Sequence, residues 1–357
     1  MNKPISSIDE IDNYSIDTGR KFFSATHEEI ERGLTSDIYF VRAQEILRYL
    51  QLEDTVVTAE IFPRKEGIFA GTKEICNLLK DKKVKLWSLE EGEGFHFKDT
   101  VMRIEGPYSE FGVFETVILG ILASSSAWAT AAYECKVAAG EKKVLCFGSR
   151  HIHPAVAPVM ERAALIGGVD GASCILGAKL SGRKPQGTIP HTVIIISKDT
   201  IKAALAYNVC MPKDVSRVIL IDTFKDEAEE SIRVAQALGK DLLGVRLDTP
   251  NERGGVTPDL VKEVRVRLNQ AGFPWVKIFV SGGLTPEKIN ILSKEQVEAF
   301  GVGSYISDAS PIDMTLDIKE VEGKPIANRG RIPGKIENKK LKRIIQKQKN
   351  FTIFINI

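Results

Sequence analysis

Polar side chains recur where short apolar runs end between residues 144 and 305. Arg246 and Asp248 flank Leu247, so both side chains point to the same side of a strand end. Two such residues can form a structural ion pair. Beside a phosphate they could equally bind a sugar phosphate, because Arg can hold phosphate through two parallel hydrogen bonds while a carboxylate accepts hydrogen bonds from sugar hydroxyls.

Two glycine-rich turns give the strongest local signal, which is for anion binding. Ser281-Gly282-Gly283 follows one apolar run, and Gly301-Val302-Gly303-Ser304 closes the next one. Glycine lets backbone N–H groups approach an anion closely, and a helix that follows adds its positive end. Tight turns alone would also explain one such segment. Two in succession near the end of a barrel favour a phosphate site.

Two further residues leave a structural and a functional interpretation open, and one pair of histidines resembles a metal site. His191 follows Gly187-Thr188-Ile189-Pro190 and precedes a predicted buried strand over residues 192–196. Phe147 ends a strand beside Gly148, where its ring suits either the core or one wall of a pocket for a flat ligand. His151 and His153 have a metal-ligand spacing, but no Cys or carboxylate cluster supports them, so no metal site is predicted.

These residues need a scaffold that gathers strand ends at one face. Apolar runs alternate with predicted helices over residues 225–238, 258–271 and 286–292, which indicates parallel βαβ units. The spacing supports six or seven units. We therefore predict an irregular or incomplete α/β barrel over residues 116–330, with its chemistry at the carboxyl ends of the strands.

The flanking regions have a different character. Residues 1–115 predict a smaller α+β domain, with a helix over 37–50 capped by Thr35 or Ser36 and β-prone runs at 56–62, 84–89 and 100–106. Residues 331–357 form a basic tail, for which a solvated, partly helical segment is favoured over a nucleic-acid contact.

The bulk composition excludes several classes of function. With 357 residues, 43% hydrophobic, 27% charged and a net charge of +2, the chain offers no case for nucleic-acid binding. The apolar stretch 117–132 is broken by Gly120 and three serines, and the N-terminus shows no signal-peptide core, so neither a membrane span nor secretion is expected. Five widely spaced cysteines suit a reducing cytoplasm rather than disulfides or zinc.

Taken together, the motifs resemble nicotinate phosphoribosyltransferase, specifically its shorter archaeal-type branch with the type II phosphoribosyltransferase fold. The resemblance covers roughly residues 14–330, and the order of so many short motifs makes it specific. It rests on Asp37-Ile38-Tyr39, Phe147-Gly148-Ser149-Arg150, the segment 167–173, Gly187-Thr188-Ile189-Pro190-His191, Arg246-Leu247-Asp248 and the two glycine turns.

The resemblance implies that nicotinate and phosphoribosyl pyrophosphate are joined to give nicotinate mononucleotide and pyrophosphate. It further implies Mg²⁺ on the pyrophosphate, a histidine that couples the reaction to ATP, and at least a homodimer with shared active sites. By position, the pyridine ring would contact Phe147, the partner's Tyr39, Arg150, Asp170 and Thr188. Catalysis would involve His191, Arg246 and Asp248, and the 5′-phosphate would lie on Ser281, Gly282, Gly283, Gly301, Gly303 and Ser304.

Two departures from the family and several alternatives remain. Cys174 stands where many relatives have Asn, and no cysteine follows Cys210, so a C-terminal zinc module is not expected. Nicotinamide is an alternative base, whereas quinolinate would need extra cations for its second carboxylate. A barrel lyase or isomerase would want a lysine at a strand end or a clear acid/base pair. A non-catalytic relative that binds a nucleotide as a sensor is a further alternative, and the presence of Arg246, Asp248 and His191 argues against it.

Overall fold

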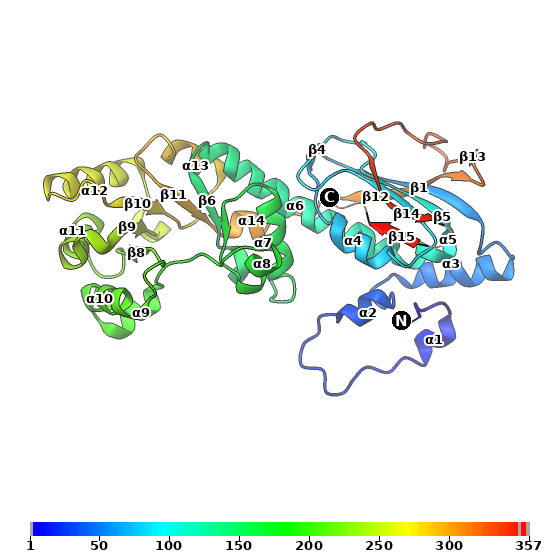
Figure 1. Cartoon of the computed structure of the whole chain (residues 1–357), viewed down its shortest axis with the longest axis horizontal. Coiled ribbons are helices and arrows are strands. Elements are labelled where there is room, and N and C mark those ends of the chain that lie inside the picture. Colours follow the sequence, from blue (N-terminus) through cyan, green and yellow to red (C-terminus); the bar gives the residue numbers. More distant parts are fainter. Residues whose placement is uncertain (1–2, 349–350, 355–357) are drawn as a thin grey trace. The chain divides into compact units, whose positions relative to one another are not determined.

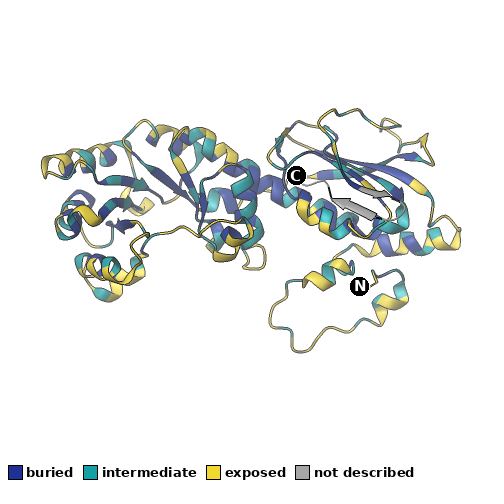
Figure 2. Cartoon of the chain, in the orientation of Figure 1, coloured by how far each residue is buried: buried dark blue, intermediate teal, exposed yellow. Residues whose placement is uncertain are grey.

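The computed structural model describes residues 3–348 and 351–354, which fold as two compact units. The N-terminal unit consists of the described residues of Met1–Ala127 and Ser310–Ile357, and the barrel unit is Trp128–Ala309. Figure 1 labels the elements of both units, and Figure 2 shows that the central strands of the two larger sheets are mostly buried while many helices keep an exposed face.

An antiparallel sheet in the order β13-β12-β1-β5-β3-β14-β15 forms the centre of the N-terminal unit. Its inward-facing residues, such as Ile61 and Ile104, are fully buried. The predicted helix over 37–50 is confirmed as α3 (Ile38–Tyr49), although its N-cap is Asp37 rather than Thr35 or Ser36. The strands are β1 (Val56–Pro63), β3 (Lys85–Ser88), β5 (Met102–Pro107), β12 (Met314–Val321), β13 (Lys324–Pro325), β14 (Lys342–Gln348) and β15 (Phe351–Phe354), with a small β2 (Gly67–Ile68) and β4 (Gly94–Phe95) pair.

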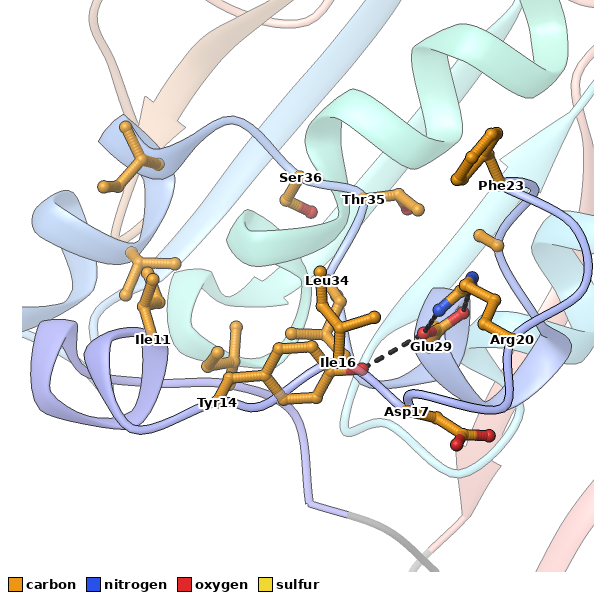
Figure 3. Close-up of a pocket in the computed structure, with 15 residues that line it drawn as sticks. Ile11, Tyr14, Ile16, Asp17, Arg20, Phe23, Glu29, Leu34, Thr35 and Ser36 are labelled. Atoms are coloured by element: carbon orange, nitrogen blue, oxygen red, sulfur yellow. Dashed lines mark hydrogen bonds and ion pairs between the residues drawn. The ribbon is translucent and has the colours of Figure 1, made fainter.

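Short helices complete this unit before the chain enters the barrel. They are α1 (Ile8–Asp12), α2 (His27–Glu31), α4 (Thr72–Leu79), α5 (Tyr108–Phe111) and the 3-10 turn η1 (Gly112–Phe114). Residues 5–41 enclose an apolar hollow of about 630 Å³. Figure 3 shows Arg20 and Tyr14 both bonded to Glu29 at its edge, with Phe23 on a loop and fully exposed.

The predicted boundary at residue 330 and the predicted partly helical tail need correction. Strand β12 pairs with β1 along most of its length, for example Ile61 with Leu316, so the chain leaves the barrel unit at residue 309 and returns to the first sheet. The basic segment is held there by ion pairs and hydrogen bonds. Arg103 donates to the carbonyl of Ile336 at 2.7 Å, while the Ile336 amide lies 3.2 Å from the buried carboxylate of Glu60. Part of the predicted tail lies outside the described residues.

Helix α6 (Glu115–Ala139) is longer than the predicted 115–132 segment, and its residues from Trp128 onward belong to the barrel unit. Within the described part of the chain, the helical stretch Tyr108–Ala139 is long and apolar enough to cross a membrane by length and composition. In its most apolar window 61% is buried inside the structure, a property that core helices share.

Six parallel strands in the order β7-β6-β11-β10-β9-β8 form the barrel unit. Strand β6, the first of this unit in the sequence, pairs with β11, the last, so that Phe300 lies opposite Val144. The sheet therefore curls and is open only between its two edge strands, β7 and β8. The predicted incomplete α/β barrel is therefore confirmed. Its strands are β6 (Lys143–Cys146), β7 (Gly171–Ala172), β8 (Arg217–Leu220), β9 (Leu242–Leu247), β10 (Lys277–Val280) and β11 (Ala299–Val302).

The helices of the barrel unit cover the outside of this sheet through residues such as Val234, Val264 and Ile289. They are α7 (Ala157–Ile166), α8 (Ile175–Leu180), α9 (His191–Ser197), α10 (Thr200–Cys210), α11 (Glu227–Leu238), α12 (Pro258–Gln270), α13 (Pro286–Leu292) and α14 (Ser304–Ser307), with 3-10 turns η2 (Gly148–His151), η3 (Gly239–Asp241) and η4 (Asn251–Arg253). The predicted buried strand over 192–196 is wrong. The segment is helix α9, in which only Ile194 is buried and Ile196 is 75% exposed.

Candidate active site

A cavity of about 420 Å³ occupies the interior of the half-barrel. Its walls are inward-facing side chains of the strands, including Leu145, Leu243 and Phe279. At the carboxyl ends of the strands it is lined by Phe147, Thr188, Arg246 and Gly301. The structure thus brings four predicted site residues, from four separate stretches of sequence, to one cavity.

Phe147 is held between the last and first strands of the barrel unit. Its backbone N–H donates to the carbonyl of Val302 at 2.7 Å, beyond the end of β6. A Cβ added to Gly301 would lie only 2.4 Å from the Phe147 ring, so glycine is required there for the ring to pack over β11. Gly301 therefore supports the aromatic wall of the cavity.

Arg246, Ser281 and Asp248 form a connected chain at the ends of β9 and β10. Arg246 Nη1 donates to Ser281 Oγ at 3.3 Å, and Ser281 Oγ donates to Asp248 Oδ1 at 2.7 Å. Arg246 Nε is buried and has no hydrogen-bond partner in the described part of the chain. A half-buried guanidinium with a free N–H is well placed to bind an anionic ligand, because an unmet buried donor is costly.

His191 lies between two carboxylates. Its Nε2 is 3.5 Å from Asp222 Oδ2 and 3.6 Å from Asp248 Oδ2, and its Nδ1 is 3.1 Å from Thr223 Oγ1. The Asp222 side chain is 2% exposed, and burial raises its pKa above the ordinary value. Its Oδ1 has no hydrogen-bond partner among the described residues.

The turn after β10 has backbone conformations that glycine adopts readily. Gly282 and Gly283 have φ values of 92° and 58°, in the left-handed region that favours glycine. Both are exposed, and the ammonium of Lys288 donates to the Gly283 carbonyl at 3.0 Å. After the neighbouring strand β11, Gly303 leads directly into α14, which begins at Ser304. Backbone N–H groups and a lysine are thus available at one edge of the sheet for a phosphate.

Two predicted site residues of the barrel unit, Asp170 and Arg150, do not line the cavity, and a third, Tyr39, belongs to the N-terminal unit. Asp170 precedes β7 and is paired with Lys136 at 2.9 Å, and it accepts the Val144 amide at 2.9 Å near the start of β6. Asp170 therefore lies at the amino ends of the strands, whereas the predicted site for the pyridine is at their carboxyl ends. Arg150 follows Phe147 on η2 and is exposed, and Tyr39 lies in the N-terminal unit with 56% of its surface exposed.

Sequence reasoning missed roles for Asp222 and Lys288. Asp222 directly follows the buried run that ends in Ile221, which is the same strand-end signal that identified Asp248. Lys288 lies on α13, one turn beyond the glycine pair, and only its contact with Gly283 distinguishes it from other surface lysines.

An open α/β barrel that gathers a cation, two carboxylates, a histidine and a glycine turn at its strand ends belongs to the class of α/β barrel proteins whose sites lie at the carboxyl ends of the strands. Residues 37–126 match the family model for the N-terminal domain of quinolinate phosphoribosyl transferase, and residues 128–317 match the model for its C-terminal domain. The chain belongs to this family, and the predicted family resemblance is confirmed.

Similar proteins agree with this assignment. A solved nicotinate-nucleotide pyrophosphorylase from Pyrococcus furiosus is 44% identical with a TM-score of 0.85, over 88% of this chain and 82% of that one. The nicotinate phosphoribosyltransferase of Bacillus subtilis is 31% identical over 62% of this chain and 46% of its own length. Human nicotinic acid phosphoribosyltransferase shares the fold, with a TM-score of 0.70 at 19% identity over 84% of this chain and 77% of that one. The chain spans about half the length of the curated relatives it matches.

Proposed function

We propose that this protein transfers the phosphoribosyl group of phosphoribosyl pyrophosphate to nicotinate, as a step in the biosynthesis of pyridine nucleotides. The pyridine nitrogen would form a bond to C1 of the ribose while the bond from C1 to pyrophosphate breaks and its electron pair leaves with pyrophosphate. The products are nicotinate mononucleotide and pyrophosphate. The observation that carries the proposal is the group of Arg246, Asp248, Asp222 and His191 beside an exposed glycine turn.

The charges of the constellation suit this reaction. Arg246 would bind the leaving pyrophosphate or the nicotinate carboxylate, and Asp248 would accept ribose hydroxyls and offset the positive charge that develops at C1. The turn at Gly282 and Gly283 with Lys288 would hold the 5′-phosphate, together with the N–H groups at Gly303 and Ser304.

The aromatic wall supports a planar acceptor. Of the three lysines that line the cavity, Lys184 pairs with Asp214 at 3.2 Å and Lys277 pairs with Glu298 at 2.6 Å, while Lys143 is the third. Because two of these cations are already balanced, the lining supports a single carboxylate on the base. Quinolinate carries a second carboxylate and remains the second candidate base, because the family descriptions name it.

Magnesium fits the site as a partner of the pyrophosphate. In the described part of the chain no group of three or more His, Cys, Asp or Glu side chains is placed to hold a metal ion. Mg²⁺, however, usually binds one or two protein carboxylates, with substrate phosphates and waters as its other ligands. Asp222, whose Oδ1 has no hydrogen-bond partner among the described residues, and Asp248 would supply the carboxylates. When bound there it would offset the charge of the leaving pyrophosphate.

We further propose that the reaction is coupled to ATP through His191 and that the protein is cytoplasmic.

We also propose that two subunits complete each active site. Two observations support such shared sites. Tyr39 and Phe23 are exposed on the N-terminal unit, and α8 and α9 of the barrel unit expose apolar side chains that a second subunit would cover. These helical residues are Ile175, Leu176, Leu180, Val193, Ile195 and Ile196.

One assay tests the proposed reaction. Purified protein is incubated with phosphoribosyl pyrophosphate and Mg²⁺ and with nicotinate, nicotinamide or quinolinate, each with and without ATP, and pyrophosphate and mononucleotide are quantified. We expect equal amounts of both products with nicotinate and a higher yield with ATP. Absence of mononucleotide with all three bases would refute the enzyme assignment, and equal rates with nicotinamide would refute the choice of base.

A further inference from the structure

A buried carboxylate outside the cavity connects two strand-end loops of the barrel unit. Glu161 lies on α7 and is 0% exposed. Its Oε1 accepts hydrogen bonds from Ser149 Oγ at 2.6 Å and Ser173 Oγ at 2.9 Å, and its Oε2 accepts the Cys174 backbone N–H at 2.6 Å. The donors follow β6 and β7, so one side chain fixes the loops beyond two adjacent strands.

Close packing leaves Glu161 little freedom to move. A Cβ added to Gly177 on α8 would lie 3.1 Å from Glu161 Cβ, so α7 and α8 approach each other tightly at this point. The turn that carries Ser149 is confined as well. A Cβ on Gly148 would lie 2.9 Å from Met160 on α7 and 3.2 Å from the Gly303 carbonyl. The carboxylate therefore binds its donors from a rigid position.

We propose that Glu161 is a positioning residue for the pyridine base, a role that rests on the proposed function. Ser149 lies between Phe147 and Arg150 on the turn that would face the base, and its bond to Glu161 sets where that turn lies. Glu161 does not line the cavity and would touch neither substrate. It acts by fixing the aromatic wall relative to the loop at Ser173 and Cys174.

The substitutions follow from the hydrogen-bond chemistry. Glu161→Ala leaves two hydroxyls and one buried amide N–H without their acceptor. Glu161→Gln keeps one oxygen for the Cys174 amide, while its NH₂ group can donate to the serine hydroxyls, which are able to accept. Glu230→Ala is the matched control, because Glu230 is 1% exposed in the same unit but pairs with Arg233 on its own helix.

The test compares steady-state kinetics for nicotinate and for phosphoribosyl pyrophosphate. We expect Glu161→Ala to raise the KM for nicotinate about 10- to 100-fold, Glu161→Gln to raise it less than about 5-fold, and the KM for phosphoribosyl pyrophosphate to change less than about 2-fold. Hydrogen exchange in peptides over 147–152 and 172–176 should accelerate in Glu161→Ala and stay unchanged in Glu230→Ala. If Glu161→Ala does not fold, Ser149→Ala serves instead, with an expected rise of about 3- to 10-fold in the nicotinate KM.

The outcomes separate this role from the proposed function. A wild-type protein that forms no mononucleotide refutes the proposed function whatever Glu161 does. An active wild type whose Glu161→Ala or Ser149→Ala variant keeps its nicotinate KM refutes the positioning role alone. Equal losses for both substrates, or the same loss in Glu230→Ala, would show that Glu161 only stabilises the fold.

Discussion

Replacing Gly301 by alanine should displace the aromatic wall of the cavity. The new Cβ would lie 2.4 Å from Cε2 and 2.6 Å from Cδ2 of Phe147, whereas ordinary contacts begin at 3.4 Å. The ring must therefore move by about 1 Å, since the Cβ also lies 3.2 Å from Ser281 Cβ on the neighbouring strand. Overpacking of this kind costs about 1–3 kcal/mol, which corresponds to a fall of about 3–10 °C in Tm.

The same displacement should lower the catalytic efficiency with nicotinate. A shift of about 1 Å in a positioning group can cost up to about 100-fold, so we expect kcat/KM for nicotinate to fall about 10- to 100-fold. Steady-state kinetics and a thermal scan measure both effects. Gly120→Ala is the control, because nothing lies within 4 Å of its added Cβ, and it should change neither quantity unfavourably.

A double variant separates the clash from the loss of the ring. Alanine at position 147 has no atom that corresponds to Cδ2 or Cε2, so Gly301→Ala with Phe147→Ala should have the same Tm as Phe147→Ala alone, without recovering activity on nicotinate. The steric argument would be refuted if Gly301→Ala alone kept the wild-type Tm and nicotinate kinetics.

Three other predictions test separate parts of the account. Asp222→Asn removes one of the two carboxylates beside His191, and we expect kcat to fall about 100-fold with little change in the nicotinate KM, as measured by initial rates. Tyr39→Ala and Asp248→Ala should each be inactive alone but regain activity when mixed, because a mixed dimer would contain one intact site; no recovery would argue against shared sites. Burial raises the pKa of Glu115 to about 7 from 4.5, so the folded protein holds this proton between these pH values while the unfolded chain releases it. Stability should therefore fall as pH rises from about 4.5 to 7 and level off above, and Glu115→Gln should be more stable at pH 8 by about 2 kcal/mol, as followed by urea unfolding. A variant with the wild-type pH profile would contradict that assignment.

The sequence predicted the barrel well because its signals are local. Runs such as 276–280 are short, apolar and followed at once by Gly or a charged residue, and each became a buried strand with its polar residues at the carboxyl end. Parallel strands then bring these ends to one edge, so the sequence alone is enough to predict that Arg246, Asp248 and Ser281 lie close together.

The failures depend on information that local patterns lack. Three isoleucines after Val193 favour a strand by propensity, yet the segment forms helix α9, in which Ile194 is buried and the other apolar side chains are exposed in the single chain. Strand β12 pairs with a strand about 250 residues earlier in the sequence, and no local pattern indicates such a pairing. Asp170 resembled a site residue by its motif, but its ion pair with Lys136 became visible only in three dimensions.

An isotope competition between the two candidate bases determines which one the enzyme uses. Nicotinate and quinolinate both give nicotinate mononucleotide, because quinolinate loses its second carboxylate as CO₂. The enzyme is therefore given a mixture of ring-deuterated nicotinate and unlabelled quinolinate, and the mass of the mononucleotide product, measured by mass spectrometry, shows which base was used. We expect deuterated mononucleotide, formed together with one pyrophosphate per molecule, and no mononucleotide from the Asp248→Ala variant. Unlabelled product accompanied by CO₂ would contradict it.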